Sequence, residues 1–145
     1  MAESRFLYIS YIRAPAQKVF AALTDPAQNQ LFWSGYHQES SWQVGADFAI
    51  VGPEGNAWDT GKVLEFDPPR RFAVTWNHQH EAAMKAEGES TCSFDVEALS
   101  DTLTKLTVTH TMPLAESKLI SAVSTGWPMI MSSLKSLLET GKPLG

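Results

Sequence analysis

The sequence predicts an α+β fold, in which a curved antiparallel sheet of about seven strands packs against one long C-terminal helix. Between Gly35 and residue 111, apolar and polar residues alternate with period two, and turn signals rich in Gly, Pro and Asp separate the alternating segments. Segment 115–140 instead places its apolar residues at helical spacing. A strand-like segment and two short helical patterns precede both regions, so the sheet and the long helix are each other's natural partners.

The first strand is expected over residues 5–12, because the run RFLYISYI is dense in aromatic and β-branched residues. Pro15 then suits the first turn of a helix, and AQKVFAALT carries apolar side chains at helical spacing. Asp25 and Pro26 end this helix and start a second short one that runs through residues 31–33. We therefore expect two short consecutive helices between the first strand and the rest of the sheet.

The remaining strands form a meander in which each strand pairs with the next through a short turn. We expect them at 39–43, 45–51, 57–66, 71–79, 89–98 and 102–111. Alternation gives three of these strands one buried face, made by Phe72, Val74 and Trp76, by Cys92, Phe94 and Val96, and by Leu106, Val108 and His110. The opposite faces are polar, which predicts a sheet with one side in solvent.

The C-terminal segment predicts an amphipathic helix over 115–140. Its apolar stripe consists of Leu119, Ile120, Val123, Trp127, Ile130, Met131, Leu134, Leu137 and Leu138. Pro128 cannot donate a hydrogen bond to the carbonyl of Ser124, and its ring disfavours helical geometry at Trp127. We therefore predict a kink or break between Ser124 and Trp127.

Length and composition indicate a single domain over residues 1–145, near the usual size of one domain. The formal net charge is −5, from 11 Lys and Arg against 16 Asp and Glu, and the basic residues are scattered, so we expect no nucleic-acid partner. Cys92 is the only cysteine, which excludes an intrachain disulfide and suits a reducing compartment. With neither a leader pattern nor an apolar run of about 18 residues, we expect a cytoplasmic protein without membrane insertion.

Three segments carry a resemblance to a known family, and they occur in the family's order: IRAPAQKVFAALTDP, GKVLEFDPPRRFAVTW and GWPMIMSSLKSLLETG. The chain resembles the helix-grip fold of the START-like, or SRPBCC, superfamily. Within it, the chain is similar to the AHSA-type family, named for an activator of the ninety-kilodalton heat-shock chaperone's ATPase. The resemblance implies a sheet bent around the C-terminal helix, with an apolar cavity between them, so part of the helix stripe is expected to line a pocket.

The candidate ligand-binding residues are aromatic and thioether side chains that would face one another across this cavity. They are Trp58, Trp76, Phe94, His110, Trp127, Ile130 and Met131. On the helix we expect Trp127, Ile130 and Met131 to roof the cavity, and Leu137 and Leu138 to seal the core. The alternative is that all of these side chains simply fill the core, as most aromatic stripes do.

Polar candidates are few. His110 would be a buried imidazole in need of a partner, either a satisfied core histidine or a group facing the ligand. His78 and His80 have metal-ligand spacing, but they precede a polar loop, so we expect solvated side chains and no metal or other cofactor. Glu65 faces the cavity if the Val63 face is inner and faces solvent if the Leu64 face is inner, and hydrophobicity favours the second.

Two further groups are expected to have no catalytic role. Cys92 lies in the middle of a strand among apolar neighbours, which predicts an inert buried thiol. The acidic residues Glu81, Glu87 and Glu89 are expected to aid solubility.

Our leading hypothesis is therefore a domain that binds a hydrophobic or aromatic small molecule. A first alternative is an enzyme of the cyclase or dehydratase kind known in the superfamily, with His110 or Glu65 as the proton-transfer group. A second is a protein-interaction or co-chaperone-like module, for which the segment Leu31, Phe32 and Trp33 is the only hint of an exposed apolar patch. A homodimer through a sheet edge or the Trp33 region is also open.

Overall fold

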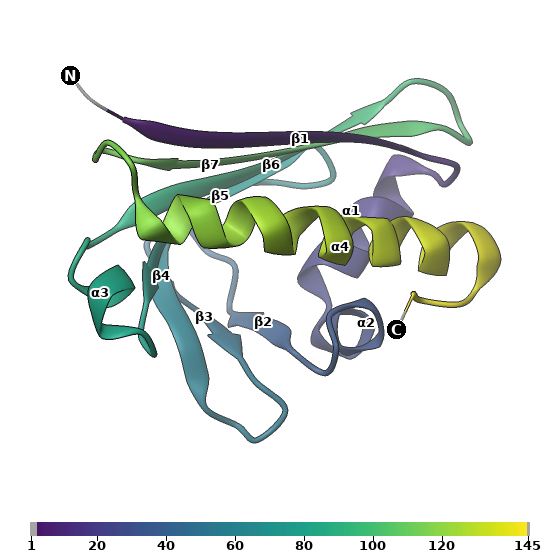
Figure 1. Cartoon of the computed structure of the whole chain (residues 1–145). Coiled ribbons are helices and arrows are strands. Elements are labelled where there is room, and N and C mark those ends of the chain that lie inside the picture. The colour runs from purple at the N-terminus through teal and green to yellow at the C-terminus, as the bar shows by residue number, and fades with distance from the viewer. Residues whose placement is uncertain (1–2, 145) are drawn as a thin grey trace.

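The structure, a computed structural model, describes residues 3–144 as one antiparallel sheet with a long helix across one face (Figure 1). The strands are β1 (Ser4–Ile12), β2 (His37–Ser40), β3 (Asp47–Val51), β4 (Ala57–Asp67), β5 (Arg71–His78), β6 (Ser90–Ala98) and β7 (Thr104–Met112). The helices are α1 (Ala16–Thr24), α2 (Pro26–Phe32), α3 (Ala82–Lys85) and α4 (Lys118–Thr140). Within the described residues, no helix combines the length and apolar character needed to cross a membrane.

The strand order is β1-β7-β6-β5-β4-β3-β2, so the first strand of the chain lies beside the last. Ser4 of β1 is opposite Met112 of β7, and Ile12 is opposite Thr104. The predicted fold class is confirmed, and the predicted strands and helices agree with the structure to within a few residues. The short helix α3, in the loop between β5 and β6, was not predicted.

A buried amide joins α1, α2 and β2. Asn29 is fully buried, and its side-chain nitrogen donates to the carbonyls of Ala22, at 2.7 Å, and Leu23, at 3.1 Å. Its side-chain oxygen accepts from the backbone nitrogen of Gln38 at 2.8 Å. Because the last carbonyls of a helix lack partners within it, this amide stabilises the end of α1, together with the Gln38 side chain, which also donates to the carbonyl of Leu23, and it fixes the start of β2.

The N-terminus of α4 is capped from a distant part of the chain. Ser117 accepts from the Ile120 backbone nitrogen, and its hydroxyl donates to Glu87 at 2.6 Å. The Glu87 carboxylate also accepts from the backbone nitrogens of Lys118, at 2.7 Å, and Leu119, at 3.3 Å. Burial alone would raise the pKa of Glu87, but these donors together outweigh it and lower the pKa below its ordinary value. The expectation that Glu87 merely aids solubility is wrong, because it ties the α3 loop to α4.

The predicted kink or break between Ser124 and Trp127 is also wrong, because α4 runs as one continuous helix from Lys118 to Thr140 (Figure 1). A proline inside a helix costs about 3 kcal/mol. The turns on either side are held by packing, since Trp127, Met131 and Leu134 are almost fully buried against the sheet. Burial of such side chains contributes about 2 kcal/mol each, which is enough to override the local preference.

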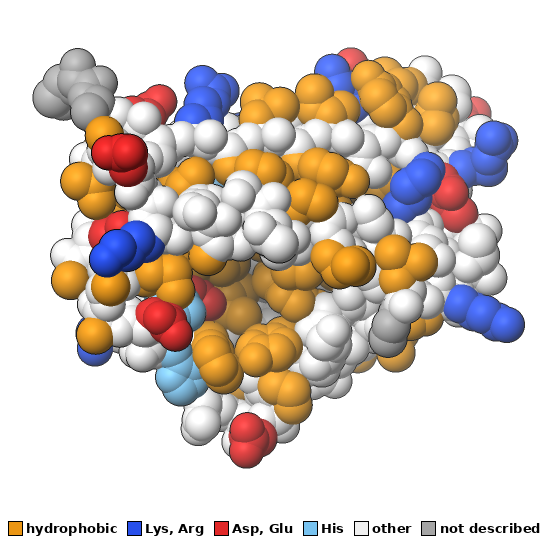
Figure 2. Space-filling model, viewed as in Figure 1, with side chains coloured by type: hydrophobic (Ala, Val, Ile, Leu, Met, Phe, Trp, Pro, Cys, Tyr) orange, Lys and Arg blue, Asp and Glu red, His pale blue; other side chains and the backbone are white. Residues whose placement is uncertain are grey.

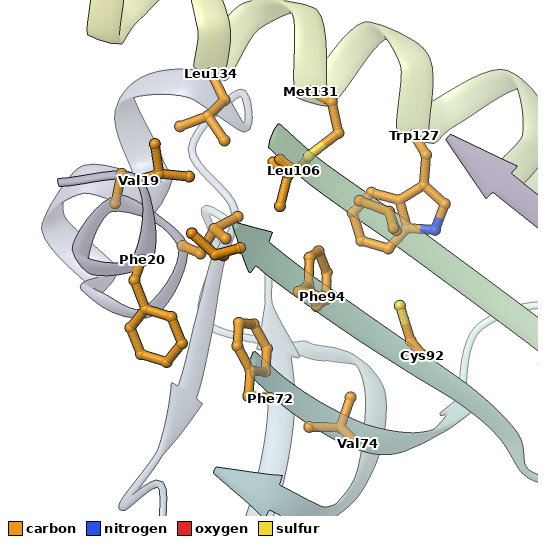
Figure 3. Close-up of a cluster of buried hydrophobic side chains, with 14 of the residues drawn as sticks. Val19, Phe20, Phe72, Val74, Cys92, Phe94, Leu106, Trp127, Met131 and Leu134 are labelled. Atoms are coloured by element: carbon orange, nitrogen blue, oxygen red, sulfur yellow. The ribbon is translucent and has the colours of Figure 1, made fainter. Parts of the chain in front are cut away.

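The packed core lies beneath the middle and C-terminal half of α4. Figure 3 shows Trp127, Met131 and Leu134 projecting from α4 toward Phe94 and Leu106 of the sheet, with α1 closing the same end of the core. Met131 therefore seals the core, whereas Leu137 and Leu138, to which that role was assigned, are only partly buried.

A bulge in β4 settles where Glu65 lies. Val63 is opposite Val74 and faces the core, but the register shifts before Glu65, which is opposite Ala73. Glu65 is therefore exposed and accepts a hydrogen bond from Arg71 at 3.1 Å. Glu65 faces solvent, as hydrophobicity favoured. The reason given for this was wrong, however, because Leu64 is exposed as well and does not lie on an inner face.

Gly61 provides a test of the close approach between β4 and β5. A Cβ atom at this position would lie 1.8 Å from the carbonyl oxygen of Thr75, which is a backbone atom and cannot rotate away. We expect Gly61→Ala to lower the free energy of unfolding by about 3 kcal/mol, because the two strands must separate. Gly126→Ala is the control: its Cβ meets nothing within 4 Å and it lies in α4, so it should stabilise the protein by about 0.5–1 kcal/mol. Urea unfolding of both variants measures the difference, and equal stabilities would contradict this account.

Candidate functional site

A cavity of about 410 Å³ lies between the N-terminal half of α4 and strands β3 to β5. Its walls also include the α2–β2 turn and Met84 of α3. The lining residues are Trp33, Ser34, Tyr36, Ile50, Trp58, Asp59, Trp76, His78, Met84, Leu119, Ala122, Val123, Gly126, Trp127, Met129 and Ile130. Figure 2 shows the hollow below the helix, with hydrophobic side chains around it and acidic and histidine atoms at one side.

The helix leaves space here because two of its residues over the cavity are small. Ala122 and Gly126 are one turn apart, and a Cβ atom added at Gly126 would meet nothing within 4 Å. Leu119, Val123 and Ile130 flank this gap on the same side of α4. In the sequence, these two small residues among the large apolar residues of α4 were the available signal for the cavity. They place the cavity nearer the start of α4 than we expected.

Aromatic rings form much of the wall. The ring centre of Trp127 lies 5.4 Å from that of Trp33 and 5.5 Å from that of Trp76. On another wall, Trp58 packs against Tyr36, with ring centres 5.7 Å apart. Gly52 makes room for Trp58, because a Cβ atom there would lie 2.5 Å from the indole nitrogen. The rings therefore surround the space from several elements.

The one acidic side chain among the lining residues is Asp59. Its Oδ1 accepts from the indole nitrogen of Trp76 at 2.8 Å and bonds Nδ1 of His78 at 2.8 Å. Asp59 and His78 lie directly opposite each other on β4 and β5, and their side chains are only 11% and 12% exposed. Burial raises the pKa of Asp59, and the hydrogen bond and charge of His78 oppose that rise.

His78 has an unused nitrogen. Its Nε2 is buried and has no hydrogen-bond partner within residues 3–144. The expectation of solvated histidines is therefore wrong for His78, although His80 is exposed and packs against Trp58. Within that part of the chain, no group of three or more His, Cys, Asp or Glu side chains is placed to hold a metal ion.

The structure divides the seven expected ligand-binding residues into two sets. Trp58, Trp76, Trp127 and Ile130 line the cavity. Phe94, His110 and Met131 are at most 1% exposed and lie in the packed core, outside the lining. Glu65 is on the outer surface, so it does not reach the cavity. Sequence reasoning missed Asp59, His78 and the α2–β2 turn, because their proximity depends on strand register.

Two other expectations concern Phe32, Trp33 and Cys92. Phe32 and Trp33 are only 3% and 9% exposed, so the suggested exposed patch reduces to Leu31, which is 55% exposed. Cys92 is fully buried, and burial raises the pKa of its thiol well above the ordinary value. The thiol is therefore protonated and enclosed, in line with an inert role.

His110 is held in a closed chain of hydrogen bonds under the cavity wall. The indole of Trp127 donates to Nδ1 at 3.2 Å, and Nε2 pairs with the Ser90 hydroxyl at 2.8 Å. That hydroxyl donates to the carbonyl of Trp76 at 2.8 Å, so Nε2 carries the proton of a neutral imidazole. Burial lowers the pKa of His110 to about 4. Both nitrogens are occupied, which makes His110 a structural group.

This pKa predicts acid sensitivity. An unfolded histidine titrates near its ordinary pKa of 6.5, so below that pH the unfolded chain binds a proton that the folded chain excludes until about pH 4. The stability contributed by neutral His110 is complete above pH 6.5 and falls as the pH drops toward 4, by up to about 3 kcal/mol. We expect His110→Gln to flatten the curve of unfolding free energy against pH in this window.

The control is His80→Gln, which removes an exposed histidine and should leave the curve close to that of the wild type. Urea unfolding at half-unit steps between pH 4.5 and 7.5 measures all three proteins. Parallel curves for the wild type and His110→Gln would show that His110 does not carry the acid sensitivity.

Comparisons with known proteins agree with this architecture. The sequence profile of the family described as Activator of Hsp90 ATPase homolog 1-like protein matches residues 13–139. A structure of protein MLL2253 from Mesorhizobium loti has a TM-score of 0.78 and 22% identity, over 94% of this chain and 97% of that one. The solution structure of the Aha1 dimer from Colwellia psychrerythraea has a TM-score of 0.75 and 20% identity, over 96% and 98%. CalU16 from Micromonospora echinospora has a TM-score of 0.75 and 22% identity, over 96% and 76%.

No curated protein sequence matches the chain. The structural likenesses, at these identities, establish the fold, and the family assignment rests on the profile, which covers nearly the whole chain. The chain belongs to the Activator of Hsp90 ATPase homolog 1-like family.

Proposed function

We propose that this protein binds a hydrophobic or aromatic small molecule in the cavity beneath α4. The observation that carries the proposal is the cavity itself, whose volume of about 410 Å³ lies in the range of small-molecule sites, roughly 300–1,000 Å³. Its walls hold four tryptophans and one tyrosine, together with aliphatic side chains from α4. Aromatic rings on several walls suit a flat apolar ligand, which can stack on one ring and meet the edge of another.

The wall on α4 supports binding more than further packing. The glycine at position 126 leaves space where a larger residue would have been favourable for both burial and helix formation, and Ala122, one turn earlier, is also small. Elsewhere on the same stripe, Met131 and Leu134 fill the interior completely. One half of the α4 face is therefore tightly packed, whereas the other half leaves a cavity. This arrangement supports a ligand-binding site.

The two alternative functions receive less support. The proton-transfer groups considered for an enzyme were His110, which has both nitrogens occupied, and Glu65, which lies on the outer surface. The surface considered for a co-chaperone-like module was the segment around Trp33, which is buried. A chaperone partner therefore stays a prediction, because the buried residues of this segment offer no surface for it.

The homodimer and the cytoplasmic location also stay predictions. Since Trp33 is buried, a dimer would use a sheet edge, and β1 is the edge strand with the larger exposed apolar side chains, Leu7, Ile9 and Tyr11. We expect Ile9→Lys to abolish any self-association, because it places a charge in the centre of this edge. Sedimentation velocity of the wild type and the variant over a concentration series measures it.

The ligand-binding proposal predicts that Gly126→Leu blocks the site. The added side chain enters open space at the cavity wall, and leucine also favours the helix, so the variant should be at least as stable as the wild type. The measurement is a thermal-shift screen of apolar and aromatic compounds, supported by native mass spectrometry after mild purification. A ligand at about a hundredfold above its Kd stabilises the wild type by about 2.7 kcal/mol, which raises the midpoint by several degrees.

Gly126→Ala is the matched control, because it has the same helix-forming advantage and adds a single methyl group. We expect compounds that stabilise the wild type to stabilise Gly126→Ala similarly and Gly126→Leu little. If no compound shifts the wild type, or if every compound shifts Gly126→Leu as strongly, the cavity is not the binding site.

A further inference from the structure

Among the described residues, the cavity lining contains an acidic residue but no Lys or Arg. Asp59 is the one acidic residue among the lining side chains, and none of the described residues that line the cavity is Lys or Arg. The Oδ1 atom of Asp59 already accepts a hydrogen bond from the indole nitrogen of Trp76 and bonds Nδ1 of His78. Its Oδ2 atom has no hydrogen-bond partner in the described chain and is not among the enclosed polar atoms, which are Gln38 Oε1 and His78 Nε2. Oδ2 is therefore an acceptor without a protein partner within residues 3–144, on a residue that lines the cavity.

The histidine beside Asp59 contacts only one of the two carboxylate oxygens. Its Nδ1 bonds the carboxylate, whereas its Nε2 is enclosed without an acceptor. Trp76 and His78 both bond Oδ1, so Oδ2 stays available to a cationic donor.

The aromatic walls add to the same preference. The faces of indole and phenol rings attract a cation, and several such rings around one space form the kind of cage that binds ammonium groups. Trp33, Tyr36, Trp58, Trp76 and Trp127 line the cavity together with Asp59. A carboxylate and several aromatic rings therefore line the same space, and both favour a cation.

From this arrangement we infer that the cavity selects an organic cation, a protonated amine carried on an apolar or aromatic body. The inference rests on the ligand-binding function proposed above and specifies the chemistry of its ligand. The ammonium group donates to Oδ2 of Asp59 and lies against the aromatic rings, while the apolar body occupies the space beneath Val123 and Gly126. A neutral ligand of the same shape would leave the carboxylate unpaired, and an anion would be repelled.

The test compares three probes with one aromatic body. They are 2-(2-naphthyl)ethylamine, the neutral 2-ethylnaphthalene and the anion 3-(2-naphthyl)propionate, each titrated into the wild-type chain at pH 7.5 by isothermal calorimetry or ligand-observed NMR. We expect the amine to bind at least about tenfold more tightly than the neutral probe, and the anion to bind more weakly than both. Because this comparison uses the wild type alone, it does not depend on the folding of any variant.

Asp59→Asn then isolates the charge. The amide oxygen can still accept from the Trp76 indole, so the fold is expected to persist while the negative charge is lost. We expect the amine to lose at least about tenfold in affinity, and the neutral probe to change by less than about twofold. Asp101→Asn, in the exposed β6–β7 turn, changes the net charge equally and should leave both affinities as in the wild type.

The outcomes separate this inference from the proposed function. Equal binding of the amine and the neutral probe, with both lost in Gly126→Leu, would overturn the cation preference and leave the hydrophobic-ligand site standing. An amine preference that persists in Asp59→Asn would also overturn it, since the carboxylate would not be its source. If none of the three probes binds the wild type, the cation inference fails, and the broader compound screen decides the proposed function independently.

Discussion

The position of α4 on the sheet depends on one buried side chain, Trp127. Its indole nitrogen donates to His110 of β7, and its ring lies within 5.6 Å, centre to centre, of Trp33, Trp76 and Phe94. A buried indole N–H needs an acceptor, and His110 can supply one only as a neutral ring that passes its own proton to Ser90. This chain of donors and acceptors fixes the helix at one point over the sheet, where hydrophobic burial alone would permit sliding.

The same residue divides the interior into two halves with different packing. Toward the C-terminus, Met131 and Leu134 continue the helix stripe into a filled core. Toward the N-terminus, small residues at 122 and 126 leave the cavity open, and Glu87 holds this end of α4 by capping its first turn. A helix clamped at its start and at Trp127 does not need a filled interior between those two points, which explains how a cavity persists under an unbroken helix that contains Pro128.

Periodicity in the sequence was enough to predict the sheet, the short helices and the faces of β5, β6 and β7, because burial repeats regularly along these elements. It was not enough for Glu65, since a bulge reverses the faces of β4 within two residues. Nor could it place Asp59 beside His78, because that pair exists only in the register that sets β4 against β5. Local rules also misjudged Pro128 and Glu87, whose behaviour is decided by packing and by a contact with a distant helix end.

Asp59 is the residue that structural needs explain least. Holding the Trp76 indole requires one acceptor, which a neutral side chain such as asparagine supplies without the cost of moving a charge out of water. Burial raises the pKa of Asp59, so the folded protein holds its ionised form at a cost in stability that two hydrogen bonds only partly offset. Residues of this kind, destabilising where they lie and open to a cavity, are characteristic of sites shaped by a ligand rather than by folding. In the proposed cation site, the charge of Asp59, its Oδ2 atom and the surrounding aromatic rings act together on one ligand.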